Sequence, residues 1–150
     1  MIVRPVERED LPQLLQLYRH LNPDDTDTPI EAAVANWERL KLYPGSDILV
    51  GVVDDVLVAS CTLIIIPNLT RGGASYALIE NVVTHADHRR HGYGKAILDA
   101  AVDAAWRAEC YKAMLLTGSK DPGTLAFYQD VGFAQSKTGF QKRRIPAKAF

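Results

Sequence analysis

The amino-acid sequence predicts an α+β fold of three layers, in which helices flank one mixed, twisted β-sheet. Apolar residues recur at helical spacing near the N-terminus, and β-rich runs follow from residue 47 onward. Short turn segments separate these runs, which predicts an antiparallel meander. A helical pattern then leads to a further β-rich run, and such a crossover favours a parallel neighbour in the same sheet. Antiparallel and parallel pairing together make the predicted sheet mixed.

The N-terminal part predicts one short strand and two helices. Residues 2–4 form the strand, and the first helix has its apolar residues at helical spacing within residues 11–21. The second helix has a well-marked start, because Thr28 can cap it, Pro29 suits the first helical position and Glu31 completes a capping box. Two helices therefore precede the main strands.

The centre of the chain predicts the meander. Residues 47–53 and 56–66 are β-rich runs, and Asp54 with Asp55 predicts a tight hairpin between them. After the loop at residues 68–73, a third strand is expected at residues 77–84.

The C-terminal part alternates helices and strands. A helix at residues 94–109 precedes a predicted strand at residues 112–117. Pro122 opens a short helix that Gly132 closes, and residues 133–145 predict the last strands. The predicted order of elements is β-α-α-β-β-β-α-β-α-β-β.

Length and composition suit one domain over residues 1–150, because 150 residues with 47% hydrophobic content can bury a sizeable core without disulfides or metal. Cys61 and Cys110 form no Cys-x-x-Cys motif, which favours reduced thiols and a cytoplasmic location. A charged N-terminus makes export unexpected. The longest apolar run, residues 56–66, is too short to span a membrane. The net charge of −1 argues against a general nucleic-acid binder.

Residues 89–95, Arg-Arg-His-Gly-Tyr-Gly-Lys, connect a predicted strand to a predicted helix and carry the main functional signal. Gly92 and Gly94 allow a tight turn, while unpaired amides and the positive end of the helix dipole favour a bound anion. A dinucleotide-binding fingerprint would need glycine at Ile97, and a P-loop would need Ser or Thr at Ala96. Neither motif is present, and ordinary loop glycines remain the simple alternative.

Read as R-x-x-G-x-G, with Arg89, Gly92 and Gly94 at the fixed positions, this segment resembles the pyrophosphate loop of the GNAT superfamily of acyl-coenzyme A N-acyltransferases. Residues 125–133, Leu-Ala-Phe-Tyr-Gln-Asp-Val-Gly-Phe, resemble the F-Y-x-x-x-G-F signature of the same family. The resemblance implies the GNAT order of elements and acetyl-coenzyme A as cosubstrate. Upstream, residues 79–83, Ile-Glu-Asn-Val-Val, lie at the separation from the loop that the family shows, and the matching segments together span roughly residues 77–133.

The resemblance also implies roles for individual residues. Glu80 would act as the base, directly or through water, and Tyr128 would protonate the departing thiolate or hydrogen-bond to it. Alternation along the strand places Leu78, Glu80 and Val82 on one face, and apolar neighbours would favour the neutral acid of Glu80. Glu80 could instead pair with a cation, and Tyr128 could simply pack in the core. The coenzyme would be bound by Val82, Val83, Arg89, Arg90, His91, Gly92, Tyr93, Gly94, Lys95 and Asp121.

One subgroup, the glucosamine-6-phosphate N-acetyltransferases, resembles the chain more closely in places. Residues 79–82, 110–112 and 140–144 are similar to that group's I-E-D-[VI], C-Y-K and basic final strand. In that group an arginine of the final strand contacts the sugar phosphate across a dimer, so a homodimer is expected. Asn81 replaces an aspartate, and Thr117 stands near a position that is acidic in the group. The candidate substrate-binding residues are Asn81, Thr117, Arg143 and Arg144.

A metal site in this region is a less favoured interpretation. His85, His88 and His91 lack a ligand partner other than Asp87 and lie among cations, so no metal site is expected.

Taken together, the loop, Glu80 and Tyr128 predict acetyl transfer to a primary amine of a small molecule by direct attack in a ternary complex. A non-catalytic acyl-coenzyme A binding module is the alternative of another class. The acidic residues of the connection between the first two helices, which could attract a cationic amine or be solvated, are Asp24, Asp25 and Asp27.

Overall fold

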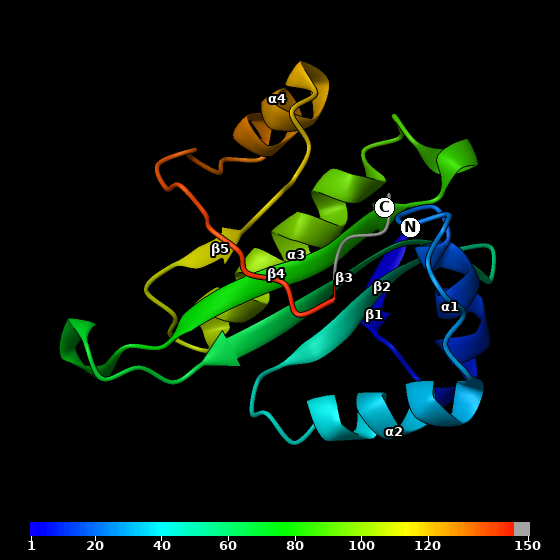
Figure 1. Ribbon diagram of the computed structural model, residues 1–150, viewed down its shortest axis with the longest axis horizontal. Helices are drawn as coiled ribbons and strands as arrows, with labels where there is room; N and C mark the ends of the chain where they lie inside the picture. The colour runs from blue at the N-terminus through cyan, green and yellow to red at the C-terminus, as the bar shows by residue number, and fades with distance from the viewer. Residues whose placement is uncertain (146–150) are drawn as a thin grey trace.

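Five strands form one sheet in the computed structural model, which describes residues 1–145 of the chain. The strands lie in the order β1-β2-β3-β4-β5, with antiparallel pairing up to β4 and parallel pairing between β4 and β5 (Figure 1). The predicted mixed sheet and α+β class are confirmed. The elements are β1 (Ile2–Pro5), η1 (Arg8–Asp10), α1 (Leu11–Tyr18), α2 (Ile30–Leu40), β2 (Asp47–Val53), β3 (Val56–Ile66), η2 (Arg71–Gly73), β4 (Tyr76–Thr84), η3 (Ala86–His88), α3 (Tyr93–Arg107), β5 (Ala113–Leu115) and α4 (Pro122–Asp130).

Two hydrophobic cores, one on each face of the sheet, produce the three layers. On one face Ile97, Leu98 and Ala101 of α3 are fully buried against the strands. On the other face Leu14 and Leu17 of α1 pack with apolar residues of β2, β3 and β4. β3 is the central strand of the sheet. Because both faces are covered, it forms an almost continuous buried run.

The hairpin between β2 and β3 turns at Asp54 and Asp55, as predicted. Both residues have positive φ values, 47° and 64°. A type I′ turn requires positive φ at both central positions, and its twist matches that of the flanking strands. Aspartate tolerates this left-handed conformation better than most residues, which explains the local sequence.

A β-bulge in β4 overturns the predicted alternation of Leu78, Glu80 and Val82. Ser60 pairs with Val83 and Thr62 with Glu80, so β4 carries one extra residue at this point. Asn81 has a φ of 51° and supplies the left-handed residue. Since an extra residue reverses the alternation, Val82 joins the core beneath α3, on the opposite face from that expected.

Two further predictions were wrong in detail. The second helix begins at Ile30 with Pro29 as its N-cap residue and no side-chain cap, because Thr28 lies one residue too early to form the capping box. The predicted strand at residues 112–117 is shorter and covers only Ala113–Leu115.

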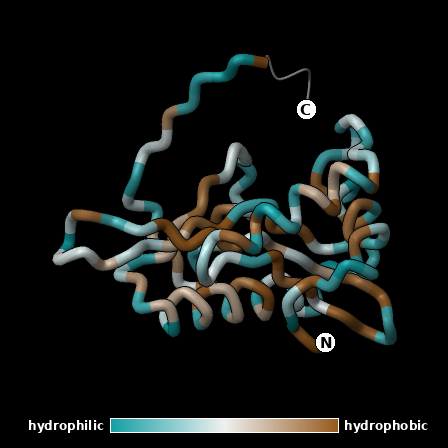
Figure 2. Tube along the Cα trace, turned by 90° about the horizontal axis from the view of Figure 1, so that it is seen from below, coloured by the Kyte–Doolittle hydropathy of each residue, from teal (hydrophilic) through white to brown (hydrophobic). Residues whose placement is uncertain are grey.

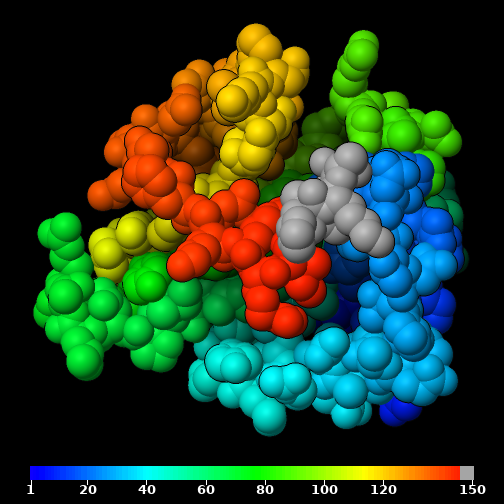
Figure 3. All heavy atoms as spheres, in the orientation of Figure 1, coloured from blue at the N-terminus to red at the C-terminus, as the bar shows by residue number. Residues whose placement is uncertain are grey.

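The described chain beyond α4, residues 131–145, contains no strand, so the predicted last strands are absent from it. Residues 134–145 are exposed throughout, and Phe140 is 95% exposed. Figure 2 shows this C-terminal segment standing away from the body of the molecule, and Figure 3 shows it passing in front of the strands. A strand needs a neighbour for its backbone hydrogen bonds, and this segment has none within the described part of the chain.

Cys61 and Cys110 are free and buried, and burial raises the pKa of the Cys61 thiol to about 12, which makes it unreactive. Within residues 1–145 no helix is both long enough and apolar enough to cross a membrane.

Candidate functional site

The anion loop, residues 85–92, connects the end of β4 to the start of α3. Gly92 is the N-cap residue of α3 and has a left-handed φ of 78°. It provides no side-chain cap, so the first amides of the helix are left for an external acceptor. The geometry therefore fits the diphosphate group that the sequence motif predicts.

Gly94 has a different function, which is to allow close packing. A Cβ atom at this position would lie 3.2 Å from Cζ of Phe127 and 3.3 Å from Oγ1 of Thr84. The phenylalanine of the F-Y signature thus packs directly on the second glycine of the loop motif. The two sequence motifs meet in space at this contact.

Replacing Gly92 by alanine should lower the free energy of unfolding by about 1 kcal/mol, because an L-residue is strained at positive φ. A displaced helix start should also weaken coenzyme A binding. Gly92→Asn is the matched control, since asparagine accepts the left-handed conformation more readily. Urea unfolding and calorimetric titration with coenzyme A measure the two effects, and equal stability of the alanine and asparagine variants would contradict this account.

The predicted loop cations differ in what they contact. The Arg89 guanidinium points back to the protein, with Nε donating to the carbonyl of Thr84 and Nη2 to that of His20. Nζ of Lys95 pairs with Oδ2 of Asp99 at 2.7 Å on the exposed face of α3. Arg90 is exposed and has no hydrogen bond or ion pair within residues 1–145. Arg90 is therefore the loop cation most available to an anion.

Aromatic rings line this loop in a continuous row. The His85 ring lies 5.3 Å from that of His88, and Tyr93 follows at 6.3 Å and stacks with His91 at 5.6 Å. His20, a residue that the sequence interpretation missed, extends the row from α1 and lies 4.0 Å from His85. Among the described residues, no group of three or more His, Cys, Asp or Glu side chains is placed to hold a metal ion.

Glu80 lies beside the bulge of β4 and is exposed. The expected apolar surroundings are therefore wrong, because the side chain faces open space instead of the core. Within the described chain it forms no ion pair, so the alternative of a structural salt bridge is not observed either. The carboxylate remains available to a ligand or a water molecule.

Tyr128 is half-buried on α4, and burial raises the pKa of its phenol. Its ring lies 5.2 Å from Phe127 and 6.5 Å from Phe133. Gly132, with a φ of 99°, ends the helix, and the amide of Phe133 donates to the Tyr128 carbonyl. This C-terminal cap explains the spacing of the F-Y-x-x-x-G-F signature. The Tyr128 ring packs against the hydrophobic core, as the alternative expects, but its hydroxyl has no hydrogen-bond partner among residues 1–145.

Backbone geometry leaves one side of β4 open toward the site. Pairing with β5 ends at Ile79 and Leu115. Beyond Ile79, where Val82 and Val83 follow, the β5 side of the strand has no partner in the described chain. An extended ligand could add there as a further strand.

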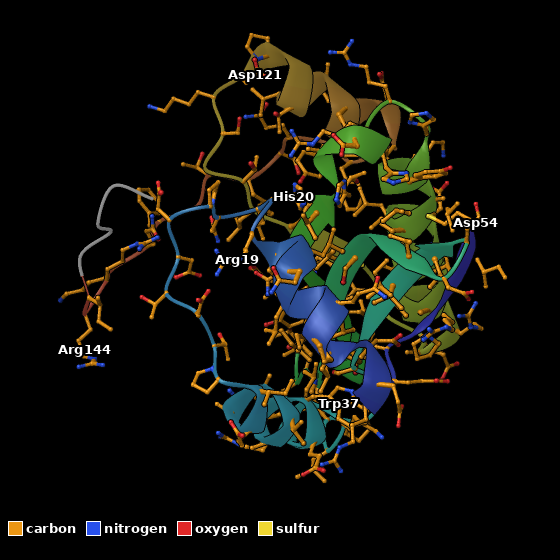
Figure 4. All side chains as sticks on the ribbon, turned by 90° about the vertical axis from the view of Figure 1, so that its right-hand side faces the viewer. Arg19, His20, Trp37, Asp54, Asp121 and Arg144 are labelled. Atoms are coloured by element: carbon orange, nitrogen blue, oxygen red, sulfur yellow. The ribbon has the colours of Figure 1, made fainter. Side chains whose placement is uncertain are left out.

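The remaining predicted residues are scattered. Asp121 caps α4, where its Oδ2 accepts from the Thr124 amide at 3.0 Å. Asn81 is exposed in the bulge, and Oγ1 of Thr117 accepts from the Ser119 amide just beyond β5. Arg143 and Arg144 lie on the exposed C-terminal segment, and Figure 4 shows Arg144 pointing away from the sheet. Within one chain, the structure does not bring these two arginines to Glu80.

A hollow of about 540 Å³ lies between α1 and the connection to α2. The acidic residues of this connection are partly engaged, because Asp27 pairs with Arg19 and Asp25 accepts from the Thr26 amide. The hollow is lined by Pro12, Leu15, Gln16, Tyr18, Arg19, Asn22, Asp25, Thr26, Asp27, Thr28 and Ile30.

Fold and site together define a class of protein. A mixed sheet with a bulged strand, a glycine-capped anion loop and a tyrosine-bearing helix suits an acyltransferase that uses a coenzyme A thioester. A family model described as the acetyltransferase (GNAT) family matches residues 11–133. The chain belongs to the GNAT family of acetyltransferases, and the predicted resemblance is confirmed.

Known relatives agree with this assignment. The chain is 31% identical to a glucosamine 6-phosphate N-acetyltransferase of Trypanosoma brucei brucei over 140 residues, which cover 87% of each chain. It is similar in structure to a putative acetyltransferase from Agrobacterium tumefaciens, with a TM-score of 0.91, 45% identity and coverage of 96% and 100% of the two chains. A Trypanosoma brucei acetyltransferase structure matches with a TM-score of 0.84, 26% identity and coverage of 95% and 98%. The protein is an acyltransferase.

Proposed function

We propose that the protein transfers an acetyl group from acetyl-coenzyme A to a primary amine of a small molecule, by direct attack in a ternary complex. The observation that carries the proposal is the open edge of β4, which runs beyond Ile79 into the anion loop. An extended pantetheine arm could pair with the amides near Val82 and Val83 while the diphosphate binds at the start of α3. The edge and the loop suit two adjoining parts of the same cosubstrate, the pantetheine arm and the diphosphate.

Each step of the reaction has a candidate group. Glu80, directly or through water, would remove the proton from the cationic amine, whose nitrogen then attacks the thioester carbonyl carbon. As the carbon–sulfur bond breaks, the Tyr128 hydroxyl would donate its proton to the sulfur, and the second proton lost by the attacking nitrogen would return, directly or through water, to the Tyr128 oxygen. Burial raises the pKa of this phenol, so it stays protonated and able to donate at neutral pH.

Thiol release from acetyl-coenzyme A tests the proposal against a panel of amines. The panel contains glucosamine 6-phosphate, polyamines, amino acids and a peptide with a free N-terminus. Selective turnover of one small amine would support the proposal and name the acceptor. Coenzyme A binding without turnover of any amine would instead favour the non-catalytic acyl-coenzyme A binding module.

Glucosamine 6-phosphate is the second candidate acceptor, and the trypanosomal relative named for that activity favours it. The chain departs from the subgroup at Asn81 and Thr117, so the amino-sugar contacts that the subgroup makes at these two positions are not carried over to this chain. Arg143 and Arg144 lie on the exposed C-terminal segment, away from Glu80 of the same chain. To contact a sugar phosphate beside Glu80, they would have to come from elsewhere than their place in this chain. A second chain could supply them.

We further propose a homodimer that forms through the C-terminal segment. The described chain leaves the outer edge of β5 unpaired, while residues 134–145 lie exposed with Phe140 and Ile145 in contact with solvent. Pairing between two copies would satisfy the edge and bury these side chains. Light scattering at micromolar concentration should give twice the monomer mass, and Phe140→Asp should reduce it; a monomeric mass for the unaltered protein would refute the dimer.

A further inference from the structure

His20, two residues after the end of α1, touches the anion loop; Figure 4 shows it beside Arg19, where the chain leaves the helix. Its Nδ1 atom accepts a hydrogen bond from the backbone N–H of Ala86 at 3.4 Å. Its carbonyl oxygen accepts one from Nη2 of Arg89, also at 3.4 Å. Its ring lies 4.0 Å from that of His85. The imidazole ring and the backbone carbonyl of His20 therefore make three contacts with the loop.

These contacts act where the loop has an unfavourable backbone conformation. Arg90 has a φ of 63° and Gly92 a φ of 78°. A left-handed non-glycine residue persists only when its surroundings hold it in place. Arg89 is tied to β4 through the Thr84 carbonyl and to the turn after α1 through the His20 carbonyl. The residue before the strained arginine is thus anchored on two sides.

The contact to Ala86 requires an unprotonated Nδ1 atom, because only a lone pair can accept the amide proton. Burial lowers the pKa of His20, and the nearby His85 and Arg89 lower it further, whereas Asp87 acts in the opposite direction. On the α1 side, the neighbouring Arg19 is paired with Asp27. The neutral ring is therefore the favoured form at neutral pH.

We propose that His20 is a positioning residue of the coenzyme site, which holds the anion loop in its binding conformation by accepting the Ala86 amide at Nδ1. The inference rests on the proposed use of coenzyme A. It assigns a function in cosubstrate binding to the turn that follows α1, a segment that carries none of the predicted coenzyme-binding residues. Each hydrogen bond is long for an N–H donor, so the loop depends on several of them together.

Three variants separate the acceptor atom from the ring. His20→Asn retains an acceptor near the Nδ1 position, whereas His20→Phe retains a ring on His85 without an acceptor, and His20→Ala removes both. The affinity for coenzyme A, measured by calorimetry, should fall roughly five- to tenfold in the alanine and phenylalanine variants. The asparagine variant should bind nearly as well as the unaltered protein. S-acetylpantetheine, which lacks the diphosphate, should bind to all four proteins alike.

The outcomes distinguish the two proposals. Equal coenzyme A affinity in all variants, or an asparagine variant as weak as the alanine variant, would overturn the role of His20 alone. A loss of S-acetylpantetheine affinity parallel to that of coenzyme A would also overturn it, because the effect would not be confined to the loop. Failure of the unaltered protein to bind coenzyme A would overturn the proposed function and this inference with it. Thermal melting shows whether each variant is folded.

Discussion

Tyr128→Phe should lower kcat for acetyl transfer about 100-fold, because the variant cannot donate a proton to the departing thiolate. The change removes one oxygen atom and keeps the ring, so the packing of Tyr128 against Phe127 and Phe133 should persist. The affinity for coenzyme A should change little. Steady-state kinetics and a single-turnover measurement test whether the loss lies in the chemical step.

Tyr111→Phe is the matched control for this substitution. Tyr111 is 41% exposed and lies in the turn between α3 and β5, where Lys112 and Arg71 approach its ring. The same loss of a hydroxyl there should leave kcat unaltered. If Tyr128→Phe and Tyr111→Phe both retain full activity, Tyr128 is not the proton donor, even though the family assignment stands.

Glu80→Gln should lower kcat/KM by about 10- to 100-fold, because an amide cannot take the proton of the ammonium acceptor. The size of the side chain is preserved, and Glu80 is exposed, so the fold should not suffer. Raising the pH should recover part of the rate, since it supplies more of the amine already deprotonated. The rate is measured by thiol release over a range of pH with a fixed amine.

Glu38→Gln tests whether loss of any surface carboxylate has this effect. Glu38 is exposed on α2, which contains none of the proposed catalytic or coenzyme-binding residues. Its substitution should change neither the rate nor the pH dependence. An unaltered pH dependence in Glu80→Gln would show that Glu80 is not the base.

Local sequence signals predicted the glycine conformation at the start of α3, because the backbone angles at such a position depend on the residue that stands there. Gly92 adopts the left-handed conformation that opens α3, and Gly132 does the same at the end of α4. Asp54 and Asp55 form the expected turn for the same reason. The residue types at these positions were sufficient to predict the local structure.

Predictions of which face of the sheet a side chain occupies, made from the alternation of residues along a strand, were less successful. Glu80 and Val82 were expected on one face, but Asn81 inserts a residue and separates them. A bulge depends on the register between β3 and β4, which alternation within β4 alone does not contain. The last strands were wrong for a related reason, since residues 134–145 have no strand neighbour in the described chain.

By itself, the sequence determined the family, the α+β class and the position of the glycine-containing connection between β4 and α3, because these depend on residue types at short spacings. Only the tertiary structure decided the exposure of Glu80, the open edge of β4 and the contact of His20 with Ala86. His20 and Ala86 are 66 residues apart, and no pattern along the chain links them. Contacts of this kind arise when separate elements pack together, so folding alone brings them into the site.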